Sequence, residues 1–255
     1  MNALLEARKV SKSFGGVQAL KDVSLTIGAG EIYGLIGPNG AGKTTFFNVL
    51  TGLYPRDGGE VSFASAPLDL GSPHRVAKAG IARTFQNIRL FGNMTARENV
   101  MVGRHVRTRA NVIGAVLRNR ATRDEEAAIR RRADELLHYV GIADRADDIA
   151  RHLSYGDQRR LEIARALATE PRLLALDEPA AGMNATETEG LKALIEGLRA
   201  DGLTVLLIEH DVKLVMGLCD RVAVLDYGEK IAEDVSAVVQ KNPQVIEAYL
   251  GGGHV

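Results

Sequence analysis

The chain has 255 residues, of which 45% are hydrophobic, and its 32 Lys plus Arg balance its 32 Asp plus Glu, so the formal net charge is zero. A balanced charge gives no electrostatic footprint for nucleic acid, so we expect no nucleic-acid partner. A single cysteine, Cys219, excludes an intrachain disulfide and suits a reducing compartment. The apolar runs are far shorter than the ~20 residues that span a bilayer, and the first residues contain no long apolar signal segment. We therefore expect a soluble, cytoplasmic protein that meets a membrane only peripherally.

Short β-rich segments open the chain, at residues 4–10, 23–27, 32–36 and 60–63. A glycine-rich loop follows the third segment, and a helical pattern begins at Thr45 immediately after it. The loop reads Gly37, Pro38, Asn39, Gly40, Ala41, Gly42, Lys43 and Thr44. This sequence fits G-x-x-x-x-G-K-[ST], and the order strand, loop, helix is the context that the motif requires. The alternative is a glycine-rich turn that binds nothing.

The glycines allow successive backbone N–H groups to point inward, which makes an anion-binding nest at a helix N-terminus. Lys43 is then placed to reach the β- and γ-phosphates of a nucleotide, and the Thr44 hydroxyl is placed to bind Mg²⁺. The loop predicts ATP and Mg²⁺ as cofactors.

The middle of the chain, at about 94–167, has a helical pattern, with Thr95 and Asp124 as predicted N-terminal caps. Residues 104–132 contain nine Arg against Asp124, Glu125 and Glu126. This basic segment is either a solvated helix face, which we favour, or a surface for anionic lipid or a membrane partner.

Bounded aliphatic segments return late, at residues 173–176, 204–208 and 222–225, with helical patterns at 186–199 and 211–218 between them. Apolar strands that alternate with helices predict an α/β fold with a parallel sheet covered on both faces. We expect the tail at 251–255 to be frayed.

Two carboxylates, Asp177 and Glu178, end the first of these late strands. Asp177 is placed to hold Mg²⁺, as the acidic residue that accompanies a phosphate loop does. Neighbouring strand residues point in different directions, so Glu178 is free to act on an attacking water as a general base. The alternative is an acidic pair that begins a surface loop.

The segment Leu153-Ser154-Tyr155-Gly156-Asp157-Gln158 resembles the L-S-G-G-Q signature of the ATP-binding cassette (ABC) ATPases. A helix N-terminus there suits a γ-phosphate, through the Ser154 hydroxyl and the Gly156 N–H. In that family the phosphate belongs to the nucleotide of a partner cassette, so two cassettes enclose two ATP molecules. Tyr155 and Asp157 depart from the signature, whereas Ser154 and Gly156 keep it.

The resemblance assigns roles to further residues. Gln86 matches the family's Q-loop residue, which touches metal or water and senses the membrane partner, and His210 matches the switch histidine that contacts the γ-phosphate. Phe14 matches the aromatic residue that stacks on adenine, although a packed Phe is the competing interpretation. Asn184 stands where many cassettes have Asp at the end of the D-loop.

The resemblance covers essentially the whole chain. It implies one ABC ATPase domain over 1–255, with a P-loop NTPase core, an N-terminal antiparallel β subdomain and a helical subdomain inserted at about 90–165. It also implies a C-terminal helix and tail at 241–255.

The signature, the segment 178–184 and the segment 242–251 are similar to the ATP-binding subunit of bacterial high-affinity branched-chain amino acid importers. This resemblance implies ATP hydrolysis coupled to import at the cytoplasmic face of the inner membrane. The implied partners are a second ATPase subunit, two permeases and, indirectly, a periplasmic binding protein. The lipopolysaccharide-export ATPase is a related alternative, and a ribosome- or DNA-acting ABC ATPase or a P-loop kinase is a less favoured one.

Overall fold

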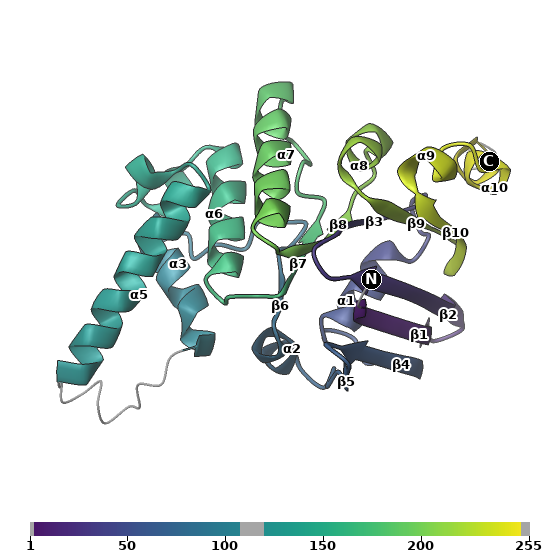
Figure 1. Ribbon diagram of the computed structural model, residues 1–255, viewed down its shortest axis with the longest axis horizontal. Helices are drawn as coiled ribbons and strands as arrows, with labels where there is room; N and C mark the ends of the chain where they lie inside the picture. Colours follow the sequence, from purple (N-terminus) through teal and green to yellow (C-terminus); the bar gives the residue numbers. More distant parts are fainter. Residues whose placement is uncertain (1–2, 108–119, 251–255) are drawn as a thin grey trace.

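The computed structural model describes residues 3–107 and 120–250, and it contains two β-sheets with helices around them (Figure 1). One sheet is antiparallel in the order β2-β1-β4-β5, and the other has the order β10-β9-β3-β8-β7-β6. In the second sheet only β10, at one edge, runs antiparallel to its neighbour. The strands are β1 (Ala3–Phe14), β2 (Val17–Gly28), β3 (Ile32–Ile36), β4 (Gly58–Phe63), β5 (Ala66–Pro67), β6 (Ile81–Arg83), β7 (Leu173–Asp177), β8 (Thr204–Ile208), β9 (Arg221–Asp226) and β10 (Glu229–Val235). The predicted α/β class is confirmed.

The described helices fall between and after these strands. The α-helices are α1 (Lys43–Leu50), α2 (Pro73–Ala79), α3 (Ala96–Arg104), α5 (Arg120–Tyr139), α6 (Tyr155–Leu167), α7 (Ala185–Ala200), α8 (Val212–Leu218), α9 (Ser236–Val239) and α10 (Pro243–Leu250). Three short 3₁₀ turns are η1 (His105–Arg107), η2 (Ala143–Arg145) and η3 (Ala150–His152). None of the helices in the described ranges is long and apolar enough to cross a membrane.

The three central strands, β3, β7 and β8, are buried along their whole length. Their successive side chains enter two different cores: Ile32 and Ile36 face the core that includes α6, α7 and α8, whereas Tyr33 and Leu35 face the core with α1 and the antiparallel sheet. A strand covered on both faces has no polar side, which explains why these segments are continuously apolar.

Helices α3, α5 and α6 pack together on one flank of the molecule (Figure 1). The predicted cap Thr95 begins α3 with a capping box, in which Thr95 Oγ1 accepts from the Glu98 N–H and the Glu98 carboxylate accepts from the Thr95 N–H. The predicted cap Asp124 is wrong, because α5 already begins at Arg120 and Asp124 lies inside its second turn. Part of the basic segment, residues 108–119, and the tail at 251–255 lie outside the described residues.

Two strands of the parallel sheet have no counterpart in the predicted elements. Strand β6 has only three residues, too few to show a pattern, and it pairs with β7 from Ile81 to Arg83. Strand β10 is polar because it lies at the sheet edge and is only partly buried. Strand β6 matters for function, since the chain that leaves it carries Gln86.

The close contact between α3 and α6 yields the first prediction. A Cβ on Gly103 would lie 2.3 Å from the Arg165 carbonyl oxygen, so the two helices approach here only because Gly103 has no side chain. We expect Gly103→Ala to lower the free energy of unfolding by about 1–3 kcal/mol, as overpacking does, in urea titrations followed by circular dichroism.

The matched control is Gly197→Ala in α7, where the new Cβ would meet only the Tyr139 hydroxyl at 3.5 Å. This change should leave stability unchanged or raise it by about 0.5–1 kcal/mol, because alanine favours a helix interior. A Gly103→Ala protein as stable as the control would contradict the close packing.

Candidate functional site

The phosphate loop leaves β3 and enters α1 through glycines in backbone conformations that other residues rarely adopt. Gly37, Gly40 and Gly42 have φ of +152°, +82° and +97°. At Gly37 a Cβ would lie 2.1 Å from the Leu225 carbonyl oxygen, so only glycine fits beside β9. Gly42 is the N-cap residue of α1, which places the loop at the positive end of the helix dipole.

Lys43, the first residue of α1, is almost fully buried, and its ammonium lies within the loop. Its Nζ donates to the carbonyl oxygens of Gly37 at 2.6 Å and Pro38 at 2.9 Å. Burial lowers the pKa of Lys43, and the charges of Glu178 and Asp177 oppose that shift. The Lys43 ammonium is therefore fixed by hydrogen bonds to the loop, and Asp177 and Glu178 are close enough to influence its charge.

A pocket of about 470 Å³ opens beside the loop and brings several of the predicted residues together. It is lined by Val17, Gln18, Ala19, Lys21, Asn39, Gly40, Ala41, Gly42, Lys43, Thr44, Thr45, Gln86, Glu178, Tyr227 and Gly228. The β2 residues and the β9–β10 turn at Tyr227 were not predicted from the sequence, since no motif marks them.

Asp177 and Glu178 lie at the carboxyl end of β7, and their environments differ. Asp177 is 3% exposed, and burial raises its pKa to about 6, with Arg83 opposing the shift and Glu178 adding to it. Glu178 leaves the strand with φ of +47°, and its N–H donates to the Ile208 carbonyl at 2.8 Å. The unusual φ turns the second carboxylate away from the sheet and toward the pocket.

Two predicted residues, Gln86 and His210, lie close to one oxygen of a third, Glu178 Oε2. Gln86 Nε2 donates to it at 2.8 Å, and His210 Nδ1 lies 3.7 Å from it. These side chains come from the ends of β7, β8 and the chain after β6, which lie side by side in the parallel sheet. The arrangement places an amide and an imidazole around a carboxylate that faces the pocket.

A buried glutamate that the sequence analysis missed organises the neighbouring loops. Glu209 is 1% exposed, and its carboxylate accepts from the Ala180 N–H at 3.0 Å and from the His210 N–H at 3.2 Å. Burial raises its pKa. Its only sequence signal is its position between an apolar strand and His210.

Phe14 does not line the pocket. Its ring is 45% exposed and packs edge-on against Tyr54, with the ring centroids 5.3 Å apart, and Lys12 Nζ lies 5.2 Å from it. In this structure Phe14 belongs to an aromatic contact between the β1–β2 hairpin and the segment after α1, which is the competing interpretation given above. Val17, three residues later, is the apolar residue that faces the pocket.

The signature residues cap α6 and do not line the same pocket. Ser154 is the N-cap residue, and its Oγ accepts from the Asp157 N–H at 3.2 Å. A Cβ on Gly156 would lie 2.7 Å from Glu187 Oε1, so glycine allows α6 to approach the start of α7. Asn184 caps α7 through a capping box with Glu187, a role that Asp would fill equally.

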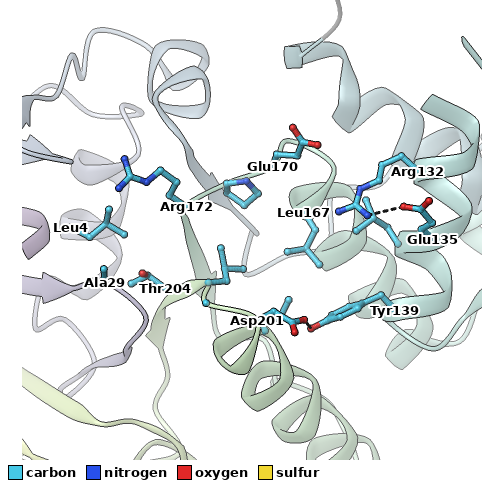
Figure 2. A pocket seen from close by; sticks show the side chains of 15 residues that line it. Leu4, Ala29, Arg132, Glu135, Tyr139, Leu167, Glu170, Arg172, Asp201 and Thr204 are labelled. Carbon is cyan, nitrogen blue, oxygen red and sulfur yellow. Dashed lines mark hydrogen bonds and ion pairs between the residues drawn. The ribbon is translucent and has the colours of Figure 1, made fainter. Parts of the chain in front are cut away.

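A larger pocket, of about 610 Å³, lies between α5 and the core and shares no residue with the phosphate-loop pocket (Figure 2). Tyr139 donates to Asp201 Oδ2 at 2.6 Å across it, and Arg132 pairs with Glu135 at 2.8 Å on its wall. These polar side chains are already paired with each other. The pocket therefore offers less chemistry than the smaller one, despite its size.

Comparison with known proteins accounts for this geometry. Residues 20–181 match the model of the ABC transporter family, and the chain belongs to that family. It is an ABC ATPase. Residues 229–255 match a second model, described as "Branched-chain amino acid ATP-binding cassette transporter".

Curated relatives align with the chain from end to end. The chain is 44% identical over 249 residues to the high-affinity branched-chain amino acid transport ATP-binding protein BraF of Pseudomonas aeruginosa, covering 97% of this chain and 98% of the relative. It is 43% identical to LivG of Escherichia coli K12 over the same shares. The lipopolysaccharide export system ATP-binding protein LptB of E. coli K12 is 36% identical over 98% of each chain.

Solved structures of ABC cassettes share the fold. The ADP conformation of the cassette MJ1267 matches with a TM-score of 0.86 and 31% identity, over 98% of this chain and all of that one. A dimeric structure of the cassette MJ0796, bound to ADP and Pi, matches with a TM-score of 0.77 and 28% identity, over 91% and 98% of the two chains.

The second prediction concerns the energetic cost of Asp177. Its pKa lies above the ordinary value of 3.8, so the folded state favours the protonated form and loses stability as pH rises toward about 6. One pKa unit corresponds to about 1.4 kcal/mol, so the ionised carboxylate costs the nucleotide-free protein up to about 3 kcal/mol. Asp177→Asn should therefore be more stable than the wild type at pH 8 in urea titrations.

The pH dependence is the control for this comparison. The stability difference should shrink as pH falls from 6 toward 4, because the carboxyl of the folded protein becomes protonated there, whereas that of the unfolded chain stays largely ionised until pH approaches 3.8. An Asp177→Asn protein that is less stable than the wild type at pH 8 would show that the ionised carboxylate stabilises the fold.

Proposed function

We propose that this protein is the ATP-hydrolysing motor subunit of an ABC importer for branched-chain, hydrophobic amino acids. The observation that carries the hydrolytic part is the convergence of Gln86 and His210 on Glu178, at a pocket that also contains Lys43. The substrate class rests on the relatives. The branched-chain transport subunits are 43–44% identical over nearly the whole chain, against 36% for LptB, and residues 229–255 match the branched-chain model.

In the proposed mechanism the phosphate loop binds ATP. Backbone N–H groups of 37–44 surround the phosphates, and Lys43 neutralises their charge. Thr45 continues the loop into α1, and Phe14 is proposed to reach adenine only if the β1–β2 hairpin moves, since it lies outside the pocket here.

Three oxygen donors at the pocket or directly beside it fit Mg²⁺: Thr44 and Gln86 line the pocket, and Asp177, which does not, precedes the pocket residue Glu178. Thr44 offers a hydroxyl, Asp177 a buried carboxylate and Gln86 an amide oxygen, and Mg²⁺ prefers such oxygen ligands together with substrate phosphates and water. The described residues contain no cluster of three His, Cys, Asp or Glu that could hold a metal by itself. A site completed by the nucleotide's phosphates agrees with this. When bound, Mg²⁺ would neutralise charge on the phosphates.

Glu178 is the proposed general base. Its carboxylate faces the pocket, and the amide of Gln86 donates to it at 2.8 Å, which restricts its orientation. His210 Nδ1 lies 3.7 Å from the same carboxylate, beyond hydrogen-bonding distance, and His210 does not line the pocket. In the proposed mechanism Glu178 accepts the proton of the attacking water, and His210 is proposed to contact the γ-phosphate.

The Ser154 and Gly156 pair is proposed to contact the ATP bound by a partner cassette, because it lies at the N-terminus of α6 and outside this chain's own pocket. The working unit is then a dimer with a second ATPase subunit, the same or related. Two membrane permeases, and through them a periplasmic binding protein, complete the importer. This chain would lie peripherally at the cytoplasmic face of the inner membrane.

The third prediction tests the base. Glu178→Gln should lower kcat for ATP hydrolysis by about 10²–10⁴-fold, the usual contribution of a general base, and leave ATP affinity nearly unchanged. The variant should accumulate as a closed dimer with ATP in size-exclusion chromatography. The exposed Glu196→Gln serves as the matched control and should behave as wild type. Near-normal hydrolysis by Glu178→Gln would remove Glu178 from the role of base.

The fourth prediction tests the phosphate loop and the substrate class together. Lys43→Ala should abolish ATP binding in calorimetric titrations, because the buried ammonium is lost, whereas the exposed Lys78→Ala should not. In cells that depend on this chain, Lys43→Ala should also abolish uptake of labelled leucine but not of lysine. Unchanged ATP affinity would contradict the proposal that the phosphate loop and Lys43 bind the phosphates of the nucleotide. Normal leucine uptake with defective lipopolysaccharide export would replace the import assignment by the export one.

A further inference from the structure

Arg159, in the second turn of α6, reaches out of its helix to the loop that carries Gln86. The arginine is 3% exposed. Its Nη1 donates to the Phe85 carbonyl at 2.7 Å, and its Nη2 donates to the Gln86 carbonyl and, at 2.9 Å, to the Tyr155 hydroxyl. One side chain of the signature helix thus binds two consecutive carbonyls of the Q-loop.

Glu162, one turn further along α6, binds the same loop through its N–H groups. Its Oε1 accepts from the N–H of Phe85 at 3.3 Å and of Arg89 at 3.4 Å, and its Oε2 lies 3.3 Å from Arg159 Nη1. Burial raises the pKa of Glu162, and the Arg159 charge opposes that shift. Arg159 and Glu162 together supply donors and acceptors to a stretch that has no strand or helix of its own.

These hydrogen bonds fix the backbone of Gln86, whose side chain contacts the proposed general base, Glu178. Gln86 is exposed and lies in a loop, so its side chain would lose conformational freedom on pointing at Glu178. Because Arg159 holds the backbone carbonyl of Gln86, the amide starts from a fixed point and donates to Glu178 Oε2 at 2.8 Å.

Tyr155, the departure from the signature, connects the same arginine to the D-loop. Arg159 lies 5.4 Å from the centroid of the Tyr155 ring and donates to its hydroxyl. A Cβ on Gly182 would lie 3.2 Å from Tyr155 Cε1, so the ring packs against the D-loop backbone. Tyr155, which stands in place of the first signature glycine, thus links the signature segment to the D-loop directly and to the Q-loop through Arg159.

A contribution to stability does not by itself explain why Arg159 and Glu162 form a buried ion pair here. Arg159 Nε has no hydrogen-bond partner among the described residues, although it is buried. Buried ion pairs can often be replaced by apolar side chains without loss of stability, since desolvation offsets their attraction. What apolar side chains could not supply is the set of bonds to the Q-loop backbone.

We propose that Arg159 is a positioning residue for ATP hydrolysis, which acts by holding the Q-loop backbone so that Gln86 reaches Glu178. The proposal rests on the proposed role of Gln86. Tyr155 and Glu162 support it by orienting the guanidinium.

The test is a double-mutant cycle on the full chain. The double change Arg159→Met with Glu162→Met removes both charges of the pair, so neither partner is left buried without the other. Arg165, whose Nη2 lies 3.9 Å from Glu162 Oε1, loses this neighbour as well, and circular dichroism verifies that the variant is folded. We expect kcat at least tenfold below wild type, with KM for ATP changed by less than threefold. Adding Gln86→Ala should lower kcat by less than twofold more, because Arg159 acts through Gln86.

The outcomes separate this inference from the proposed function. If Gln86→Ala alone loses turnover and the Met pair does not, Arg159 has no positioning role and the proposed role of Gln86 stands. If Gln86→Ala alone keeps full turnover, both fail. The loss of kcat from the Met pair and the loss from Gln86→Ala could instead be equal and fully additive as free energies in the triple variant. The Met pair would then have a merely structural effect, and the inference would be overturned.

Two further variants keep the test independent of folding. Arg159→Lys retains the charge beside Glu162 but cannot bind both carbonyls, so its kcat should fall between those of wild type and the Met pair. A wild-type kcat would overturn the inference. The matched control is Arg160→Met, the neighbouring arginine, whose Nη1 donates to the Val140 carbonyl at 2.8 Å and does not touch the Q-loop. Its kcat should stay within twofold of wild type.

Discussion

The structure depends on a parallel sheet that is buried on both faces. Strands β3, β8 and β7 are buried along their whole length and mostly apolar, with Asp177 at the end of β7 as the charged exception, because helices cover one face and α1 with the antiparallel sheet covers the other. Such strands have no polar face to use for chemistry. Polar side chains can be placed only where the strands end, and the carboxyl ends of neighbouring parallel strands lie at one edge. This constraint brings the phosphate loop, Asp177 and Glu178, and His210 together although they are far apart in sequence.

Folding also buries several charged groups at this edge of the sheet, where they lose contact with water. Lys43, Asp177 and Glu209 are all buried. Burial favours the neutral form of each group, so it lowers the pKa of Lys43 and raises the pKa of Asp177 and of Glu209. Such groups destabilise a protein unless they are paired or bind a ligand. In the proposed function a nucleotide and its metal bring opposite charge to Lys43 and Asp177, so their binding adds to the free energy of unfolding.

Much of the site could be predicted because its motifs are local. The phosphate loop needs glycines at fixed spacing, and Asp177 and Glu178 directly follow an apolar strand. Glu209 and Arg159 carry no such signal, since their roles arise only when α6 packs beside the Q-loop or when two loops meet. The fold shows the same division. The long apolar strands were predictable, whereas β6 has only three residues and is defined by its pairing with β7. Phe14 lies outside the pocket with its ring against Tyr54, and its contact with adenine stays a prediction.

The N-terminal part of helix α6 has two functions in the proposed dimer. Its N-terminus, at Ser154 and Gly156, serves the partner's nucleotide, and one turn later Arg159 holds the Q-loop of this chain's own site. Because both groups lie in the first two turns of one helix, a displacement of this helix N-terminus at the partner's phosphate would also move Arg159 and the Q-loop backbone that Arg159 holds. Tyr155 adds the D-loop to the same junction through Gly182. If the proposed dimer is correct, Arg159, Glu162 and Tyr155 form a short physical connection between the partner's phosphate and Gln86 of this chain.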